Sequence, residues 1–194
     1  MQQVYKSFPE KQAPVPDEIL NGCRKGDSRS QEALYKKYSR LMFAVCIRYT
    51  DNRQSAEDLL QEGFIKVFHA IHDFREDGSL EGWIRKIMVR TALEHFRKKV
   101  NFFPLSPIEK AAGSQMDEQI LSNMASTEIM DAMNGLSPGY KTVLNLYCVE
   151  GYSHKEIADL LGITEGTSKS QLSRAREIMK DLLKDYQTDR RENA

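Results

Sequence analysis

Helix start and stop signals crowd together near the C-terminus, and they restrict the fold more than any other feature of the sequence. Ser153 and Glu156 have the Ser-x-x-Glu spacing of a capping box, which predicts a helix beginning at His154. Gly162 is predicted to end that helix, because a helix C-terminus favours a residue in the left-handed conformation. Thr164 is placed to cap the helix that follows. Two helices joined by such a short glycine turn predict a helix-turn-helix.

Another helix start precedes this motif. Ser137 followed by Pro138 predicts an N-cap with proline at the first helical position. The helix after it is predicted to direct four residues toward a core: Val143, Leu144, Leu146 and Tyr147. In the final helix, apolar residues recur every three or four positions, and four are predicted to face inward: Leu172, Ala175, Met179 and Leu183.

The N-terminal surface of the final helix is predicted to carry basic and small polar residues. They are Thr167, Ser168, Lys169, Ser170, Gln171, Ser173, Arg174 and Arg176. Lysine and arginine can neutralise phosphates or read guanine, and glutamine can read adenine in the major groove. A plain solvated helix face is the alternative, but the capped, glycine-turned helix in front of it favours DNA binding.

Positive charge is concentrated locally, although the chain as a whole is neutral. Its 194 residues include 28 Lys and Arg and 28 Asp and Glu. In residues 83–100, six basic residues stand against one acid, Glu94, which is a local excess of five. The six are Arg85, Lys86, Arg90, Arg97, Lys98 and Lys99. A nucleic-acid partner would therefore find its counter-charges on particular helices.

No cofactor and no metal site is predicted. The cysteines, Cys23, Cys46 and Cys148, are far apart and are typical of small buried thiols in a reducing compartment. The histidines lack the close spacing of metal ligands: His69, His72, His95 and His154. The N-terminus has no signal-peptide pattern, and the longest apolar run, 41–47, is far too short to span a bilayer. A cytoplasmic location without membrane insertion is therefore expected.

Helical patterns dominate the chain, and no sustained alternating run predicts a strand, so the predicted fold class is all-α. Two small helical domains are predicted at 17–100 and 117–186, the second containing the helix-turn-helix. A polar linker is predicted at 101–116 because proline, glycine and serine gather there, and tails are predicted at 1–16 and 187–194.

Within the first domain, Ser55 is predicted to cap a helix with Asp58 at its third position. Its inward face would consist of Leu59, Leu60, Phe64, Val67, Phe68 and Ile71. Residues 74–82 are predicted to form a loop, and Trp83 to open the basic helix. The buried stripe of that helix would consist of Ile84, Ile87, Met88, Leu93 and Phe96.

Two helical domains, a tryptophan-led basic helix and a C-terminal helix-turn-helix together resemble a bacterial sigma factor of the sigma-70 family. The likeness is to the small extracytoplasmic-function (ECF) group, which keeps only regions two and four, and it covers about residues 17–185. The motifs that carry it are residues 56–64 (AEDLLQEGF), 82–87 (GWIRKI), 136–138 (LSP) and 166–176 (GTSKSQLSRAR). Their order and separations make the set strongly specific.

This resemblance implies a docking face on the helix that follows Ser55. Four residues share one side of it at three- and four-residue spacing: Asp58, Gln61, Glu62 and Ile65. In the family this face binds the clamp coiled coil of the largest subunit of core RNA polymerase. A solvated surface is the plain alternative. Phe64 either packs at the edge of that contact or belongs to the core.

The resemblance also implies that the 74–82 loop and the basic helix open promoter DNA. In the family the loop captures a base flipped from the minus-ten element, and the basic helix holds the displaced strand. Trp83 either anchors the loop by packing or stacks on a base. Arg90 stands where many relatives have asparagine, and Leu80 where an aromatic residue is common, so the family's base preference is not carried over.

For the helix-turn-helix, the resemblance implies contacts with the minus-thirty-five element through the basic and polar set of the final helix. The linker would thread toward the polymerase active-site and RNA-exit channels. Phe102 and Phe103 at its start either anchor it or belong to the first domain's core. The family further implies an anti-sigma factor as a partner.

The leading hypothesis is therefore a promoter-specificity subunit that binds core RNA polymerase and promoter DNA and helps melt the start site. It is not an enzyme and has no small-molecule substrate, because the sequence has no nucleophile–base pairing, metal cluster or phosphate loop. A stand-alone helix-turn-helix regulator is the alternative, but it leaves the Asp58 face and the basic helix unexplained. A small helical enzyme or scaffold is the third hypothesis.

Overall fold

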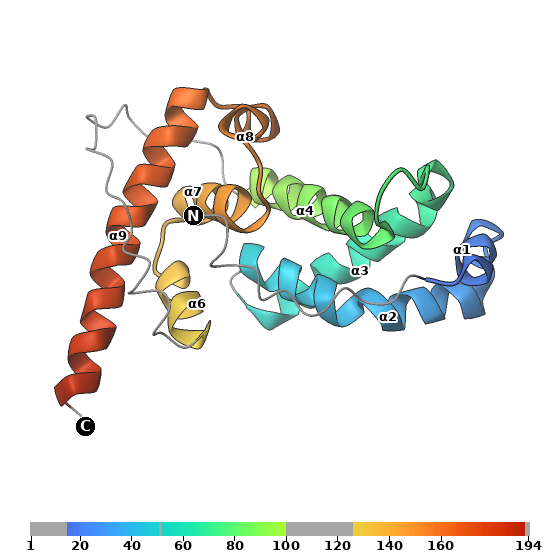
Figure 1. Cartoon of the computed structure of the whole chain (residues 1–194), viewed down its shortest axis with the longest axis horizontal. Coiled ribbons are helices and arrows are strands. Elements are labelled where there is room, and N and C mark those ends of the chain that lie inside the picture. Colours follow the sequence, from blue (N-terminus) through green and yellow to red (C-terminus); the bar gives the residue numbers. More distant parts are fainter. Residues whose placement is uncertain (1–14, 51, 100–125, 193–194) are drawn as a thin grey trace. The chain divides into compact units, whose positions relative to one another are not determined.

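A computed structural model of the chain describes residues 15–50, 52–99 and 126–192, and every regular element in these ranges is helical (Figure 1). The chain divides into two compact units, one with helices α1 to α4 and one with α6 to α9. The first contains α1 (Asp17–Arg24), α2 (Ser28–Cys46), η1 (Ile47–Tyr49), α3 (Arg53–Ala70), η2 (Ile71–Asp73) and α4 (Leu80–Lys99). The second contains α6 (Ser126–Asn134), α7 (Pro138–Leu144), η3 (Asn145–Val149), α8 (His154–Leu161) and α9 (Glu165–Glu192). The predicted all-α fold is confirmed.

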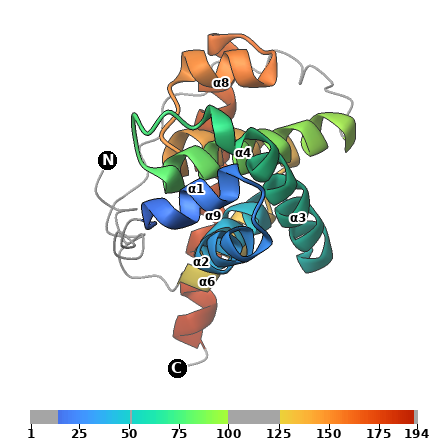
Figure 2. The same ribbon diagram turned by 90° about the vertical axis from the view of Figure 1, so that its right-hand side faces the viewer.

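In the first unit, α2, α3 and α4 pack against one another around a shared core (Figures 1 and 2). Side chains from all three helices are almost completely buried there, among them Leu34, Met42, Leu59, Phe64, Ile84 and Met88. Phe64 is 2% exposed, so it belongs to this core and not to a surface contact. Burial raises the pKa of the Cys46 thiol to about 12, in agreement with a structural, unreactive cysteine.

The start of α3 differs from the prediction. Asn52 is the N-cap, and its side-chain oxygen accepts a 2.8 Å hydrogen bond from the backbone N–H of Ser55. Ser55 is therefore the third helical residue, and the prediction that it caps the helix is wrong. Asparagine and serine are both good caps, and the helix uses the earlier of the two.

Helix α4 also begins earlier than predicted, at Leu80 and not at Trp83. The hydroxyl of Ser79 accepts a hydrogen bond from the Gly82 N–H at 3.0 Å, which satisfies a backbone group that the first turn leaves free. The half-buried ring of Trp83 lies 5.5 Å from the ring of Phe74. This contact supports the packing alternative for Trp83.

The buried stripe of α4 is only partly as predicted. Ile84, Met88 and Leu93 are buried as expected, but Ile87 is half-exposed. Val89 and Ala92, which were not predicted, are buried, because α4 packs against both α2 and α3 and so buries a wider face. The Phe96 side chain lies outside the described residues, as do Phe102, Phe103, the tail at 1–14 and the linker at 101–116.

In the second unit, α7 begins at Pro138 with Ser137 at the N-cap position, although the Ser137 hydroxyl makes no capping hydrogen bond. The chain continues into the π-helical turn η3, in which the Glu150 N–H bonds to the Asn145 carbonyl five residues back at 3.0 Å. The wider turn changes the direction of the side chains that follow. Tyr147 is consequently 36% exposed, and the prediction that it faces the core is wrong.

The helix-turn-helix boundaries are confirmed. Ser153 and Glu156 form the reciprocal capping box, with the Ser153 N–H donating to the Glu156 carboxylate at 2.8 Å. Gly162 ends α8 with a φ of 68°, which glycine adopts without a steric penalty. Thr164 caps α9 by accepting a bond from the Thr167 N–H at 3.0 Å. The predicted inward-facing residues of α9 are all buried: Leu172, Ala175, Met179 and Leu183.

Candidate functional site

The first turns of α9 expose a small basic surface. Lys169, Ser170 and Arg174 are exposed, and three further predicted residues are half-buried: Thr167, Ser173 and Arg176. Ser168 and Gln171 are buried, so the prediction that these two lie on the surface is wrong. The helical repeat explains the difference, because positions 168, 171, 172 and 175 lie on one face, and Leu172 and Ala175 turn that face inward.

The charges on this surface are held by weak intrahelical pairs. Lys169 Nζ lies 3.5 Å from a Glu165 carboxylate oxygen, and Arg174 Nη1 lies 2.9 Å from a Glu177 oxygen. Pairs of this kind between exposed side chains contribute little, so a phosphate or a base edge can replace the carboxylate. Both cations therefore remain available to a nucleic acid.

His154, at the start of α8, connects the two helices of the motif. Its Nδ1 lies 2.9 Å from the Ser168 hydroxyl, which explains why Ser168 faces inward. On its other side the imidazole stacks on Tyr147, with ring centroids 4.5 Å apart. Burial, helped by the positive charges of Lys169 and Arg176, lowers the pKa of His154. A neutral imidazole thus holds the first turn of α8 against α9.

Acid is expected to loosen this contact. Since folding lowers the pKa of His154 from 6.5, the unfolded chain takes up the proton more readily, and the free energy of unfolding falls as the pH drops below 6.5. Urea denaturation followed by circular dichroism at about pH 7.5 and about pH 5.5 measures this loss. The loss of unfolding free energy should be smaller in His154→Gln than in the wild type. The control variant His72→Gln, which changes an exposed histidine, should lose as much as the wild type. Equal losses in all three proteins would contradict the role of His154.

The predicted docking face lies on α3, and three of its four residues are accessible. Asp58 and Gln61 are exposed, and Ile65 is 57% exposed, one of the few large apolar side chains at the described surface. Gln61 donates to the Tyr35 hydroxyl at 3.0 Å, and Asp58 accepts from Gln54 at 3.2 Å. An exposed aliphatic side chain one helical turn from an exposed amide, on the same side of the helix as an exposed carboxylate, is suited to a protein partner.

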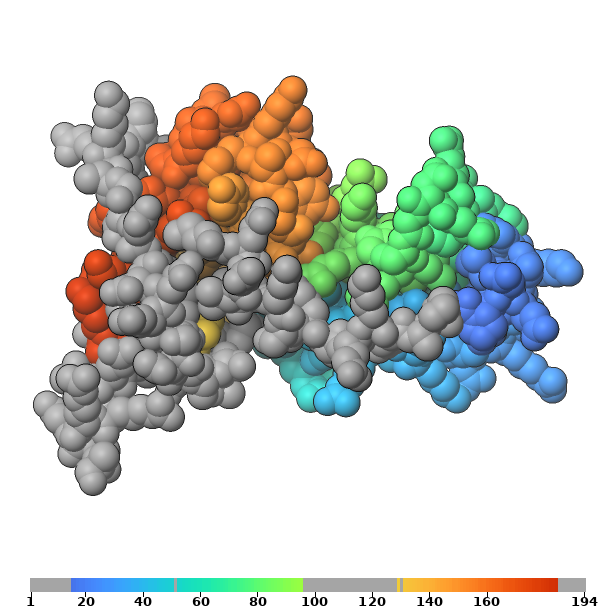
Figure 3. All heavy atoms as spheres, viewed as in Figure 1, coloured from blue at the N-terminus to red at the C-terminus, as the bar shows by residue number. Residues whose placement is uncertain are grey.

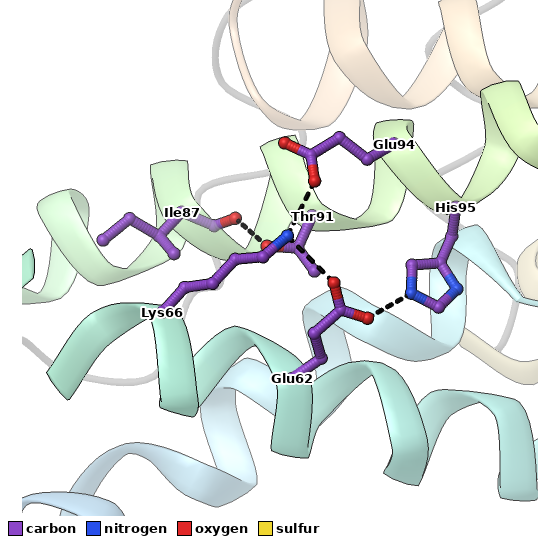
Figure 4. Close-up of polar contacts among 6 residues, drawn as sticks. All are labelled: Glu62, Lys66, Ile87, Thr91, Glu94 and His95. Atoms are coloured by element: carbon purple, nitrogen blue, oxygen red, sulfur yellow. Dashed lines mark hydrogen bonds and ion pairs between the residues drawn. The ribbon is translucent and has the colours of Figure 1, made fainter. Parts of the chain in front are cut away.

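Glu62, the fourth residue, faces α4 and is engaged within the chain (Figure 4). It contacts the His95 ring and lies 2.9 Å from Lys66 Nζ, which in turn reaches Glu94 at 2.7 Å. Hydrogen bonds from His95 and Lys66 lower the pKa of Glu62, whereas Lys66 has a raised pKa because its two carboxylates outweigh its partial burial. This network ties α3 to α4 and neutralises much of the charge of Glu62.

The basic helix α4 offers cations on the surface of the first unit. Lys86 and Arg90 are exposed four residues apart on one side of α4, and Arg85 is half-buried. Among the residues that the structure describes, Lys86 and Arg90 make no hydrogen bond or ion pair. Two neighbouring like charges without internal partners are suited to a polyanion. Arg97, Lys98 and Lys99 lie in α4, but their side chains are outside the described part.

Sequence reasoning missed the two histidine contacts, because it considered His95 and His154 only as metal ligands. The spacing of Glu62 and Lys66, four apart in one helix, could have revealed the start of the network. No spacing could have revealed a contact between residues on different helices. Within the described ranges, no group of side chains has the arrangement of a metal site. No helix there has the length and apolar character needed to cross a membrane.

Two protein-family models match the chain: Sigma-70 region 2 over residues 34–101 and Sigma-70, region 4 over residues 126–179. The "ECF RNA polymerase sigma factor SigE" of Mycolicibacterium smegmatis is 26% identical over 170 residues, which cover 85% of this chain and 66% of that protein. The "RNA polymerase sigma-H factor" of Pseudomonas aeruginosa is 26% identical over 183 residues, covering 86% of this chain and 92% of that protein. The solved sigma factor RpoE from Bartonella quintana, in complex with the anti-sigma factor NepR, matches with a TM-score of 0.52 and 25% identity. That match covers 79% of this chain and 96% of the solved chain.

Proposed function

The chain belongs to the sigma-70 family of RNA polymerase sigma factors, in the ECF group, and we propose that it is a promoter-specificity subunit of bacterial RNA polymerase. It binds the core enzyme, recognises promoter DNA and helps melt the start site. It carries out no chemistry of its own, uses no cofactor and acts in the cytoplasm. The observation that carries the proposal is the presence of both family regions, each with its own basic helix surface, in one chain.

Melting by such a protein requires only differential binding. The double helix is in equilibrium with a locally opened form, and a subunit that binds the unstacked strand shifts this equilibrium toward the open state. Stacking surfaces and a cationic track supply that binding energy. Arg85, Lys86 and Arg90 on α4 would form the track, continued by Arg97, Lys98 and Lys99.

The two DNA elements are assigned to different units. The domain at 17–100 would bind core polymerase through Asp58, Gln61, Glu62 and Ile65 and the minus-ten element through the α4 cations. The domain at 117–186 would bind the minus-thirty-five element through Lys169, Ser170 and Arg174, with Thr167, Ser173 and Arg176 at its margin. Ser168 and Gln171, being buried, are assigned to holding α9 in place.

An anti-sigma factor is the partner proposed to control this activity. The Bartonella quintana relative was solved in complex with one, and the likeness extends over most of both chains. Since the anti-sigma factor and the polymerase would compete for the sigma factor, the α3 face around Ile65 is the surface where we expect the competition. A stand-alone helix-turn-helix regulator is not favoured, since it has no need of a region 2 domain.

A transcription assay tests the proposal. Purified core RNA polymerase transcribes fragmented DNA from the source genome, with and without this protein. Discrete start sites that appear only with the protein are expected, and aligning the sequences upstream of them identifies both promoter elements. If no new starts appeared and core polymerase did not co-elute with the protein, the regulator alternative would replace the proposal.

Replacing Arg174 with alanine is expected to weaken binding of duplex minus-thirty-five DNA roughly tenfold, because one arginine contact to a base or phosphate is lost. Core polymerase binding should be unchanged. Electrophoretic mobility shifts with the holoenzyme measure the first quantity, and co-elution with core measures the second. Lys184→Ala, an exposed cation further along α9, is the matched control. Unchanged DNA affinity in Arg174→Ala would remove Arg174 from the interface.

A further inference from the structure

The segment 74–79, between η2 and α4, has a fixed base and an open tip. Phe74 is 7% exposed and packs on Trp83, whereas residues 75–79 are all exposed. Glu76 has a φ of 64°, the only non-glycine residue with a positive φ in the described chain. A side chain in this conformation is sterically disfavoured, and such residues persist where surrounding contacts hold them.

The contact that holds this segment comes from α1, some fifty positions earlier in the sequence. Arg24 Nη2 donates to the Phe74 carbonyl at 2.9 Å and lies 2.9 Å from a Glu76 carboxylate oxygen. The Arg24 side chain is 27% exposed, so the contact is partly shielded from water. In Figure 3 the exposed segment projects from the surface beside α1, and α1 also packs against η2.

One guanidinium thus bonds to the first and the third residue of the turn at 74–76, through the Phe74 carbonyl and the Glu76 carboxylate. Because it bonds to a main-chain carbonyl and to the side chain of the strained residue, it restricts both the position and the conformation of the turn. Both contacts involve the same nitrogen, Nη2, whose two N–H groups have fixed directions in the guanidinium plane, whereas a lysine ammonium rotates freely. The contact is nevertheless too exposed to determine whether the unit folds.

We propose that Arg24 is a positioning residue for segment 74–79, which it holds in the conformation that captures an unstacked promoter base. The inference rests on the proposed function and on the family resemblance, which implies that this loop captures the flipped base of the minus-ten element. Arg24 acts through the segment and does not itself need to touch DNA. Helix α1 is therefore part of the promoter-opening apparatus, although its charges lie outside the cationic track of α4.

The test measures how much one captured base contributes to binding. Holoenzyme would be titrated with fluorescent single-stranded oligonucleotides of the non-template minus-ten strand from a promoter found in the transcription assay. Each base is replaced in turn by an abasic site. In the wild type, loss of the captured base should weaken binding roughly tenfold, as expected for one stacked base. In Arg24→Gln, replacing that base by an abasic site should weaken oligonucleotide binding no more than about twofold, because the variant already holds the intact base poorly.

This comparison separates positioning from general damage. A variant that was simply misfolded would bind intact and abasic oligonucleotides equally poorly, whereas loss of positioning leaves the binding of the abasic oligonucleotide unchanged. Lys25→Gln removes the neighbouring exposed charge at the C-cap of α1 and should behave as the wild type. Glu76→Gln, which keeps the carbonyl contact, should lie between the wild type and Arg24→Gln.

A full abasic penalty in Arg24→Gln would overturn the inference while leaving the proposed function intact. Weaker binding of the abasic oligonucleotide by Arg24→Gln than by the wild type would also overturn it, since a general structural role would then suffice. If the wild type showed no abasic penalty at any position, base capture by this segment would itself be wrong. The role of Arg24 would then fall with it.

Discussion

Replacing Gly63 with valine is expected to lower the free energy of unfolding of the α1–α4 unit by roughly 3 kcal/mol. Helices α3 and α4 touch at this position, and a Cβ there would lie 2.2 Å from Sδ and 3.0 Å from Cε of Met88. Met88 is fully buried in a closely packed core, so its sulfur can move only by displacing neighbouring side chains. Relieving the clash requires the Met88 side chain to repack in the core or the two helices to separate, and these helices carry the proposed docking and DNA surfaces.

Urea denaturation followed by the fluorescence of Trp83, the chain's only tryptophan, measures this loss where it occurs, since Trp83 lies in the first turn of α4. His69→Val places the same β-branched residue at an exposed site on α3 and should cost only about 0.5 kcal/mol. Combining Gly63→Val with Met88→Ala should cost less than the sum of the two single changes, because alanine vacates the space that valine needs. Additive losses would show that the steric contact is not the cause.

The helix boundaries of the second unit were predictable because local chemistry determines them. A capping box at Ser153 and a left-handed glycine at Gly162 act within a few residues of chain, and the structure has both. The start of α4 was missed for a related reason. Trp83 is the more conspicuous residue, but Ser79 supplies the hydrogen bond that a helix start requires.

Errors about which side chains are buried have a different origin. Ser168 and Gln171 are polar and were assigned to the DNA surface, but the three- and four-residue spacing places them with Leu172 and Ala175. Applying the helical repeat to polar as well as apolar residues would have corrected this. Tyr147 could not have been placed in that way, because a π-helical turn interrupts the regular repeat.

The contacts that organise the candidate sites lay beyond the reach of sequence reasoning. Arg24 meets Phe74 and Glu76 across about fifty residues, and His95 meets Glu62 across 33. Such pairs depend on how the helices pack against one another. Neither residue type nor spacing along the sequence reveals that packing.

Replacing Asp58 with arginine and Ile65 with serine together is expected to weaken binding to core RNA polymerase roughly 30-fold or more. Both side chains are exposed on α3, so the partner and not this chain would bury them. Removing an apolar anchor loses buried contact area, and reversing the charge of Asp58 turns attraction to a cationic partner group into repulsion. Each change affects the interface directly, because within the described residues the hydrogen-bond partner of Asp58 is Gln54, a neighbour on its own helix.

Glu62 is left out of this variant because it also joins α3 to α4 through His95 and Lys66, so reversing its charge would disturb the fold as well as the interface. Fluorescence anisotropy of labelled protein titrated with core polymerase measures the affinity, and urea denaturation should show unchanged stability. Glu18→Arg on α1 makes the same charge reversal at an exposed site away from α3 and should bind normally. If the Asp58 and Ile65 double variant bound core polymerase as tightly as Glu18→Arg, polymerase would have to bind elsewhere on the chain.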